Sequence, residues 1–168
     1  MPDTMKLTLL FPPAIAGALQ IAAKTQRKEV TEIIHRATVD RLIEDGFITG
    51  ADKDEHIMFW ELVDEAVKVA VERVKQGHFN SAITLDTFRI CVDRPAWRSK
   101  AEKYLGESVY RHGNEKKGRL NREIGFRIRA ALNAVVDREP NGKTNTVKVT
   151  GEMIQSYSPF LSYDKSAF

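Results

Sequence analysis

Hydrophobic and polar residues alternate near the start of the chain and then recur at helical spacing. Between Lys6 and Phe11 the sequence KLTLLF places leucine or phenylalanine at every second position, which is the period of a β-strand. Pro12 and Pro13 end the alternation, because proline cannot donate to a strand ladder but suits the first turn of a helix. The pattern predicts a short strand followed at once by a helix that starts near Pro13.

Two amphipathic segments follow this strand. Apolar residues recur at helical spacing in residues 14–24 and again, at three- and four-residue steps, in residues 30–43. The polar sequence KTQRKE separates the two segments, and Gly46 is well placed to end the second helix. The first 46 residues are therefore predicted to form strand, helix, tight turn and longer helix.

The remaining residues predict a mostly helical region. A connector over residues 47–55 leads into a strongly periodic helical segment, residues 56–77. Residues 83–92 suit either a strand or a helix, and helical patterns return in residues 96–111 and 117–136. The turn signal EPNGKTN and the alternating TVKVTGEM then suggest a small β-hairpin. We expect a mainly α protein with an N-terminal domain, residues 1–46, and a helical C-terminal domain, residues 47–168.

Composition narrows the class of protein. The chain has 168 residues, of which 42% are hydrophobic, enough for a packed core. We find neither a signal-peptide pattern nor an apolar run of membrane-spanning length, and therefore expect a cytoplasmic protein with no membrane partner. Cys91 is the single cysteine, which excludes an internal disulfide and suggests a small core residue.

Positive charge is concentrated in one part of the chain. Residues 1–93 carry 11 Lys and Arg against 15 Asp and Glu, whereas residues 94–129 carry 11 against 4. Aromatic residues such as Trp97 and Tyr104 are interleaved with this charge, as on nucleic-acid-binding surfaces, although aromatics at these intervals also suit a core. The segment predicts either a polyanion-facing surface or a solvated basic helix face.

No known catalytic or metal-binding motif is found. The four histidines, His35, His56, His78 and His112, lack metal-ligand spacing, and no phosphate-binding glycine loop or nucleophile elbow is present. We expect no enzymatic activity, no cofactor and no metal.

The layout of residues 5–46, from MKLTLLFPP through AIAGALQIAAKTQRKEVTEIIHRATVDRLIEDG, resembles the ribbon-helix-helix family of DNA-binding proteins, which includes the Arc repressor. The resemblance implies a homodimer, in which the strands of two copies pair as an antiparallel ribbon above four interlocked helices. Leu7, Leu9 and Phe11 would then face the shared core.

The outward face of such a ribbon enters the DNA major groove. By position, Lys6, Thr8 and Leu10 would read bases, the last only by apolar contact. The resemblance also implies that the start of the second helix grips a phosphate, with Arg27, Lys28 and Thr31 there.

The basic segment offers a second candidate DNA contact. Residues 121–136 followed by DREPNGKTNTVKV suit a recognition helix and β-wing, or a capped amphipathic helix with a hairpin behind it. The first arrangement would place four arginines near DNA, namely Arg119, Arg122, Arg127 and Arg129.

The sequence thus favours a homodimeric, sequence-specific DNA-binding protein. Family members act as transcriptional repressors or as accessory factors in plasmid and phage DNA processing, and double-stranded DNA is the expected partner. The alternative is a helical assembly or adaptor protein that uses the same fold only to dimerise.

Overall fold

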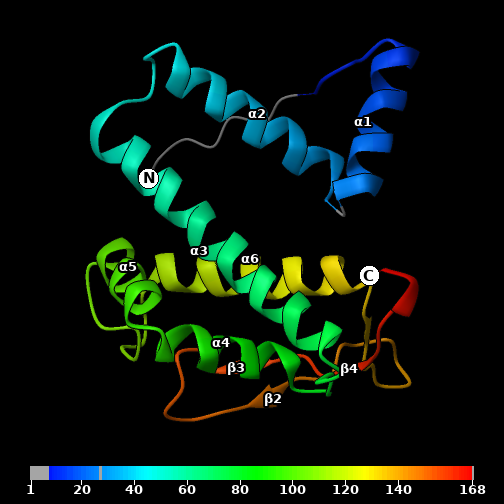
Figure 1. Cartoon of the computed structure of the whole chain (residues 1–168), viewed down its shortest axis with the longest axis vertical. Helices are drawn as coiled ribbons and strands as arrows, with labels where there is room; N and C mark the ends of the chain where they lie inside the picture. Colours follow the sequence, from blue (N-terminus) through cyan, green and yellow to red (C-terminus); the bar gives the residue numbers. More distant parts are fainter. Residues whose placement is uncertain (1–7, 27, 168) are drawn as a thin grey trace.

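The computed structural model describes residues 8–26 and 28–167, and these residues form a mainly helical protein (Figure 1). The helices are α1 Pro13–Gln26, α2 Val30–Glu44, α3 Gly50–Lys75, α4 Ile83–Asp93, α5 Pro95–Leu105 and α6 Glu115–Leu132, with a 3-10 turn η1 at Lys165–Ala167. The short strands are β1 Val135–Val136, β2 Val147–Lys148, β3 Ser156–Tyr157 and β4 Phe160–Ser162. The predicted mainly α fold with a small β element is confirmed.

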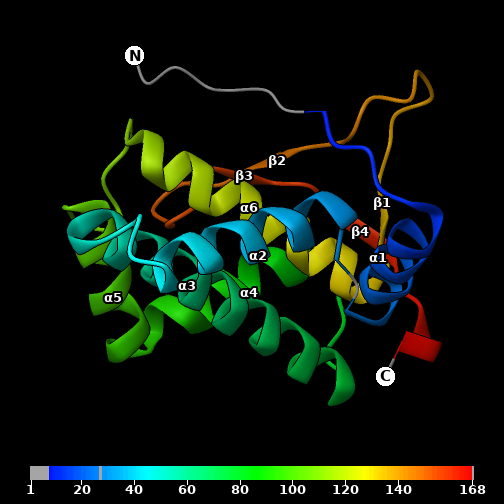
Figure 2. The ribbon, with the colours of Figure 1, turned by 90° about the horizontal axis from the view of Figure 1, so that it is seen from above.

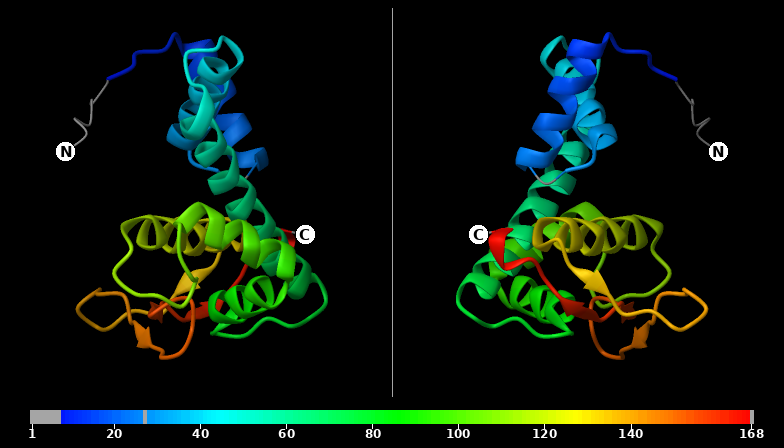
Figure 3. Two further views of the ribbon diagram at one scale, coloured as in Figure 1. Left: turned by 90° about the vertical axis from the view of Figure 1, so that its left-hand side faces the viewer. Right: turned by 90° about the vertical axis from the view of Figure 1, so that its right-hand side faces the viewer.

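The hydrophobic core lies among α3, α4, α5, α6 and the small strands. The long helix α3 packs against α4, α5 and α6, and Leu62, Ile83, Trp97, Ile124 and Leu132 are each 0–1% exposed at its centre. The β1–β4 pair adds Val136 and Phe160 to this core. No apolar side chain of α1 or α2 belongs to it, and the two helices stand as a pair above the body (Figure 3).

Helix boundaries follow local sequence signals. The carbonyl oxygen of Pro12 accepts from the amides of Ile15 and Ala16, so α1 begins at Pro13 as predicted. Gly46 adopts a positive φ of 78° just after α2, which confirms it as the stop. Gly106, at φ 73°, ends α5 six residues earlier than the predicted helix over residues 96–111.

Two other predicted boundaries change. The helix α3 begins at Gly50, inside the predicted connector over residues 47–55. The helix α6 starts at Glu115, where the Asn114 side chain accepts from the Lys117 amide, and it ends at Leu132 because Asn133 turns into the left-handed conformation.

The segment after α6 contains two strand pairs and a tight hairpin. The strand β1 pairs with β4, and β2 pairs with β3. The predicted turn does form a tight hairpin, in which Arg138 and Thr144 make an isolated bridge and Gly142 adopts a φ of 84°. A helix followed by a hairpin is common to both interpretations of this segment, so a DNA contact through a β-wing stays a prediction.

Cys91 is buried in α4 as expected, and burial raises the pKa of its thiol to about 12. Because the thiolate is the reactive form, we predict that iodoacetamide does not alkylate the folded protein at pH 8 but labels it fully in denaturant. Mass spectrometry of the two samples checks this. Rapid labelling of the folded protein would mean that α4 opens locally.

Candidate nucleic-acid interface

The segment before α1 and the surface of α1 expose apolar side chains. The helix α1 has no buried residue, although it packs against α2. The exposed apolar side chains of this region are Leu9, Leu10, Phe11, Ile15 and Ile21. Water would contact five large apolar groups here, so the single chain leaves an apolar surface that a second copy could bury.

The predicted base-reading residues lie in this segment. Leu10 is 94% exposed and Thr8 is also exposed, while Lys6 lies outside the described residues. Residues 8–11 form no strand within the single chain. The predicted ribbon requires a strand from each of two copies, so it remains a prediction, and the exposure of Thr8 and Leu10 is compatible with it.

The start of α2 presents both a cation and a carboxylate. Lys28 lies 4.0 Å from Glu32, one turn into the helix, and Thr31 is exposed. Glu29 occupies the N-cap position with an extended backbone, but its side chain makes no capping hydrogen bond. Arg27 lies outside the described residues. Of the predicted phosphate-gripping residues, Thr31 lies in the first turn of α2 and Lys28 just before it, on either side of the exposed carboxylate of Glu29.

A buried ionic cluster joins α2 to the body. Glu32 in α2 is 5% exposed and pairs with Arg127 of α6, 95 residues away, and Arg36 Nε lies 3.0 Å from a Glu32 oxygen. Arg36 also bonds both Asp64 oxygens of α3 at 3.0 Å, with its guanidinium 3.5 Å from the Trp60 ring centroid. Charge-assisted bonds of this kind are strong and geometrically specific.

The pKa of Glu32 reflects both its burial and the basic side chains around it. Burial raises the pKa of the Glu32 carboxyl, and the positive charges of Arg127, Arg36 and Lys28 oppose that rise. Arg127 is itself only 8% exposed and also bonds Glu123, one turn back on α6. Arg127 is therefore not placed to contact DNA, because its guanidinium is buried against Glu32 and Glu123. The other three candidates, Arg119, Arg122 and Arg129, are exposed on α6.

The aromatic residues of the basic segment divide between core and surface. Trp97 is 1% exposed and its indole Nε1 donates to the Leu62 carbonyl at 3.3 Å, and Tyr104 is 3% exposed. Tyr110 is 43% exposed, with the Arg98 guanidinium 5.4 Å from its ring centroid. The core alternative is therefore correct for Trp97 and Tyr104.

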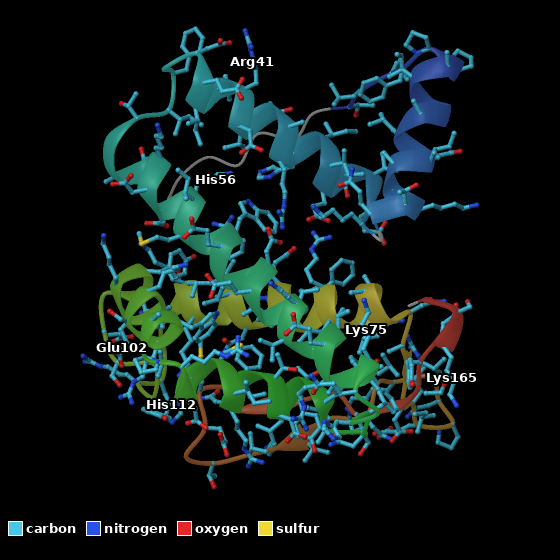
Figure 4. All side chains as sticks on the ribbon, in the orientation of Figure 1. Arg41, His56, Lys75, Glu102, His112 and Lys165 are labelled. Atoms are coloured by element: carbon cyan, nitrogen blue, oxygen red, sulfur yellow. The ribbon has the colours of Figure 1, made fainter. Side chains whose placement is uncertain are left out.

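Histidines do not converge on a common site. Figure 4 labels His56 on the upper part of α3, toward α2, and His112 at the far side of the body. His56 Nε2 lies 3.7 Å from Asp40, and burial lowers the pKa of its imidazole although Asp40 opposes this. Within the described ranges, no three His, Cys, Asp or Glu side chains are grouped so as to hold a metal ion.

None of the helices in the described part of the chain is both long enough and apolar enough to cross a membrane. No protein-family model, curated protein or solved structure matches the chain. The site must therefore be interpreted from its own residues.

Sequence reasoning did not find the ionic cluster. The only local signal was the one-turn spacing of Glu32 and Arg36, which is equally typical of a solvated helix face. Nothing in the sequence links Glu32 to Arg127, because that pair is created by the packing of α2 above α6, visible from above in Figure 2.

Proposed function

We propose that the protein is a homodimeric DNA-binding protein of the ribbon-helix-helix type, in which residues 6–11 of two copies pair and read the major groove. It would act as a transcriptional repressor or as an accessory factor in plasmid or phage DNA processing. Lys6, Thr8 and Leu10 would contact bases, while Arg27, Lys28 and Thr31 would contact phosphates.

The proposal of a dimer rests on one observation: the apolar side chains of the segment before α1 are exposed in the single chain. Leu9 is 54% exposed and Phe11 41% exposed, although both belong to the strand face predicted to turn inward. A six-residue strand cannot pair its own backbone, whereas two copies satisfy each other's amides and cover these side chains.

The lengths of the elements support the same arrangement. The helix α1 has 14 residues and α2 has 15, with three residues between Gln26 and Val30. The short connection keeps the start of α2 near the end of α1, and a helix N-terminus presents backbone amides that favour a phosphate, although the Glu32 amide donates to the Glu29 carbonyl at 3.1 Å.

The alternative, a helical assembly protein that never touches DNA, is favoured by Glu29. Its carboxylate is exposed at the N-cap of α2, where it would repel a DNA phosphate, although it suits the helix dipole. Both functions require the dimer, so only a DNA measurement separates them.

The test is retention of a duplex at graded salt. We expect the full-length protein to bind a nonspecific duplex at low salt and to lose affinity steeply as salt rises, because phosphate contacts release counterions. After an operator is selected from random duplexes, the Lys6→Ala and Thr8→Ala variants should lose preference for it, whereas Lys28→Ala should weaken binding to all sequences alike.

Controls separate DNA reading from folding. The Lys165→Ala variant changes a single charge in η1, at the other end of the chain, and should bind DNA as the parent does. Duplex binding that is absent at low salt would support the assembly alternative. An unchanged operator preference in both ribbon variants would exclude base reading by the ribbon.

A further inference from the structure

A cavity of about 720 Å³ lies between one face of α6 and the segment that carries β2 and β3. Figure 1 shows β2 and β3 below α6, and Figure 4 labels His112, which lines the cavity. A volume of this size is in the range of small-molecule sites, which run from about 300 to 1,000 Å³. The cavity is separate from the exposed segment before α1, so it is independent of the proposed DNA reading.

Positive charge predominates in the wall of this cavity. Lys117, Arg122 and Arg129 belong to its wall, which contains no Asp or Glu. Within the described ranges, neither guanidinium lies within 4.0 Å of a carboxylate, and Lys117 Nζ donates to the Arg111 carbonyl at 2.7 Å. By contrast, Arg127 and Lys116 of the same helix both pair with acidic side chains.

Burial makes the charge of Lys117 costly, whereas Arg122 and Arg129 are exposed. Lys117 is 5% exposed, and burial lowers the pKa of its ammonium group. Opposite charge close to a buried ammonium stabilises its charged form. An anion in the cavity would therefore interact more strongly with Lys117 than with a lysine on the open surface.

Other groups in the wall suit the rest of an organic ligand. The side-chain oxygen of Asn121 is buried and has no hydrogen-bond partner among the described residues. An amide can turn to present either its oxygen or its NH₂ group, so Asn121 can bond a donor or an acceptor. Phe126 and Tyr157 add aromatic surface to the wall.

A glycine keeps the α6 wall open. Gly125 lies in the middle of α6 and lines the cavity, and a Cβ built there would meet nothing within 4 Å. Glycine in a helix interior costs about 0.5–1 kcal/mol relative to alanine. No steric contact among the described residues requires a glycine at this position, and a large side chain here would enter the cavity.

We propose that this cavity binds a small organic phosphate, with its phosphate group held by Arg122 and Arg129, two turns apart on α6, and its remaining part against Asn121 and the aromatic wall, while Lys117 adds positive charge near the start of α6. Guanidinium groups suit this ligand because they bond phosphate oxygens in pairs, whereas Lys117 contributes a point charge.

The test uses pyrophosphate and phenyl phosphate as probes of the full-length protein. We expect both to shift the backbone amide resonances of α6 residues that line the cavity, with dissociation constants on the order of 1 mM. Phenol, which has no phosphate, should produce much smaller shifts at equal concentration. Absence of shifts up to 10 mM pyrophosphate at low salt, a concentration of about ten times that constant, would overturn the proposal.

Variants distinguish a built site from general charge attraction. The double variant Arg122→Ala/Arg129→Ala should weaken pyrophosphate binding at least about tenfold, because two charge-assisted contacts are lost. Arg119→Ala removes a charge from the same helix outside the cavity wall and should bind as the parent does. Equal weakening by both changes would show nonspecific attraction and overturn the proposal.

A third variant tests the cavity without removing charge. Gly125→Leu should fill the space and weaken phenyl phosphate binding at least about tenfold, while improved helix propensity keeps the fold. Circular dichroism confirms that the helix is retained. Unchanged phenyl phosphate affinity in Gly125→Leu would overturn the proposal. A DNA duplex that shifts the same amide resonances at a lower concentration than pyrophosphate would also overturn it, since DNA would then be the ligand.

Discussion

Replacing Arg127 with methionine is expected to lower the free energy of unfolding by about 3 kcal/mol, at the lower end of the cost of breaking a buried ion pair. The change leaves the Glu32 carboxylate buried with only part of its compensating charge, because Arg36 must also serve Asp64. Methionine keeps most of the apolar volume of the arginine side chain, so the change in the free energy of unfolding measures the loss of the positive charge. Urea denaturation followed by circular dichroism measures it.

Two further variants make this result specific. Arg122→Met alters an exposed arginine on the same helix and should change stability by less than about 0.5 kcal/mol. Adding Glu32→Gln to Arg127→Met should recover much of the loss, because the uncompensated carboxylate is removed and Arg36 keeps Asp64. If Arg127→Met were as stable as Arg122→Met, the cluster would contribute nothing to the attachment of α2.

Exchange of Phe11 for aspartate is expected to weaken the proposed dimer at least about 100-fold, equivalent to some 2.7 kcal/mol. In the ribbon, Phe11 from each copy faces the shared core, where a carboxylate would lose its hydration without a partner. The dimer should then dissociate at micromolar concentration and DNA binding should be lost with it. Analytical ultracentrifugation of the full-length protein measures the change.

The neighbouring variant Leu10→Asp is the matched control. Successive residues of a strand point to opposite faces, so Leu10 lies on the outward face of the same ribbon. Leu10→Asp should therefore keep the dimer but lose DNA binding, because its charge faces the duplex. Equal effects of both variants on the oligomeric state would contradict the ribbon, and a parent protein that is monomeric would contradict the dimer itself.

Local interactions explain which elements were predictable. The start of α1 at Pro13 and the end of α2 at Gly46 depend on residues within one turn, so sequence patterns locate them. Residues 83–92 remained ambiguous because α4 is buried over a wide part of its surface, including Thr84, Thr87 and Cys91. A helix that is apolar or buried on most sides has no clear period, and a short one resembles a buried strand.

The candidate sites were predictable only in part. The exposed residues Thr8 and Leu10 follow from a strand pattern, and their predicted role depends on a second copy of the chain. The sequence showed that α6 carries several arginines, but not which of their side chains point into the protein and which point to its surface. Arg127 is buried against Glu32, while Arg122 and Arg129 line a cavity, although all four candidates are alike in the sequence.

The sequence by itself determined the mainly helical class, the two successive helices within the first 46 residues and the concentration of positive charge after residue 93. These features depend on composition and local periodicity. Only the tertiary structure decided which charges are paired. The Glu32–Arg127 contact joins residues 95 positions apart, and the cavity is formed by α6 together with a segment that returns to it from 144 to 160. Contacts between residues so distant arise from packing of whole elements, and no local pattern encodes them.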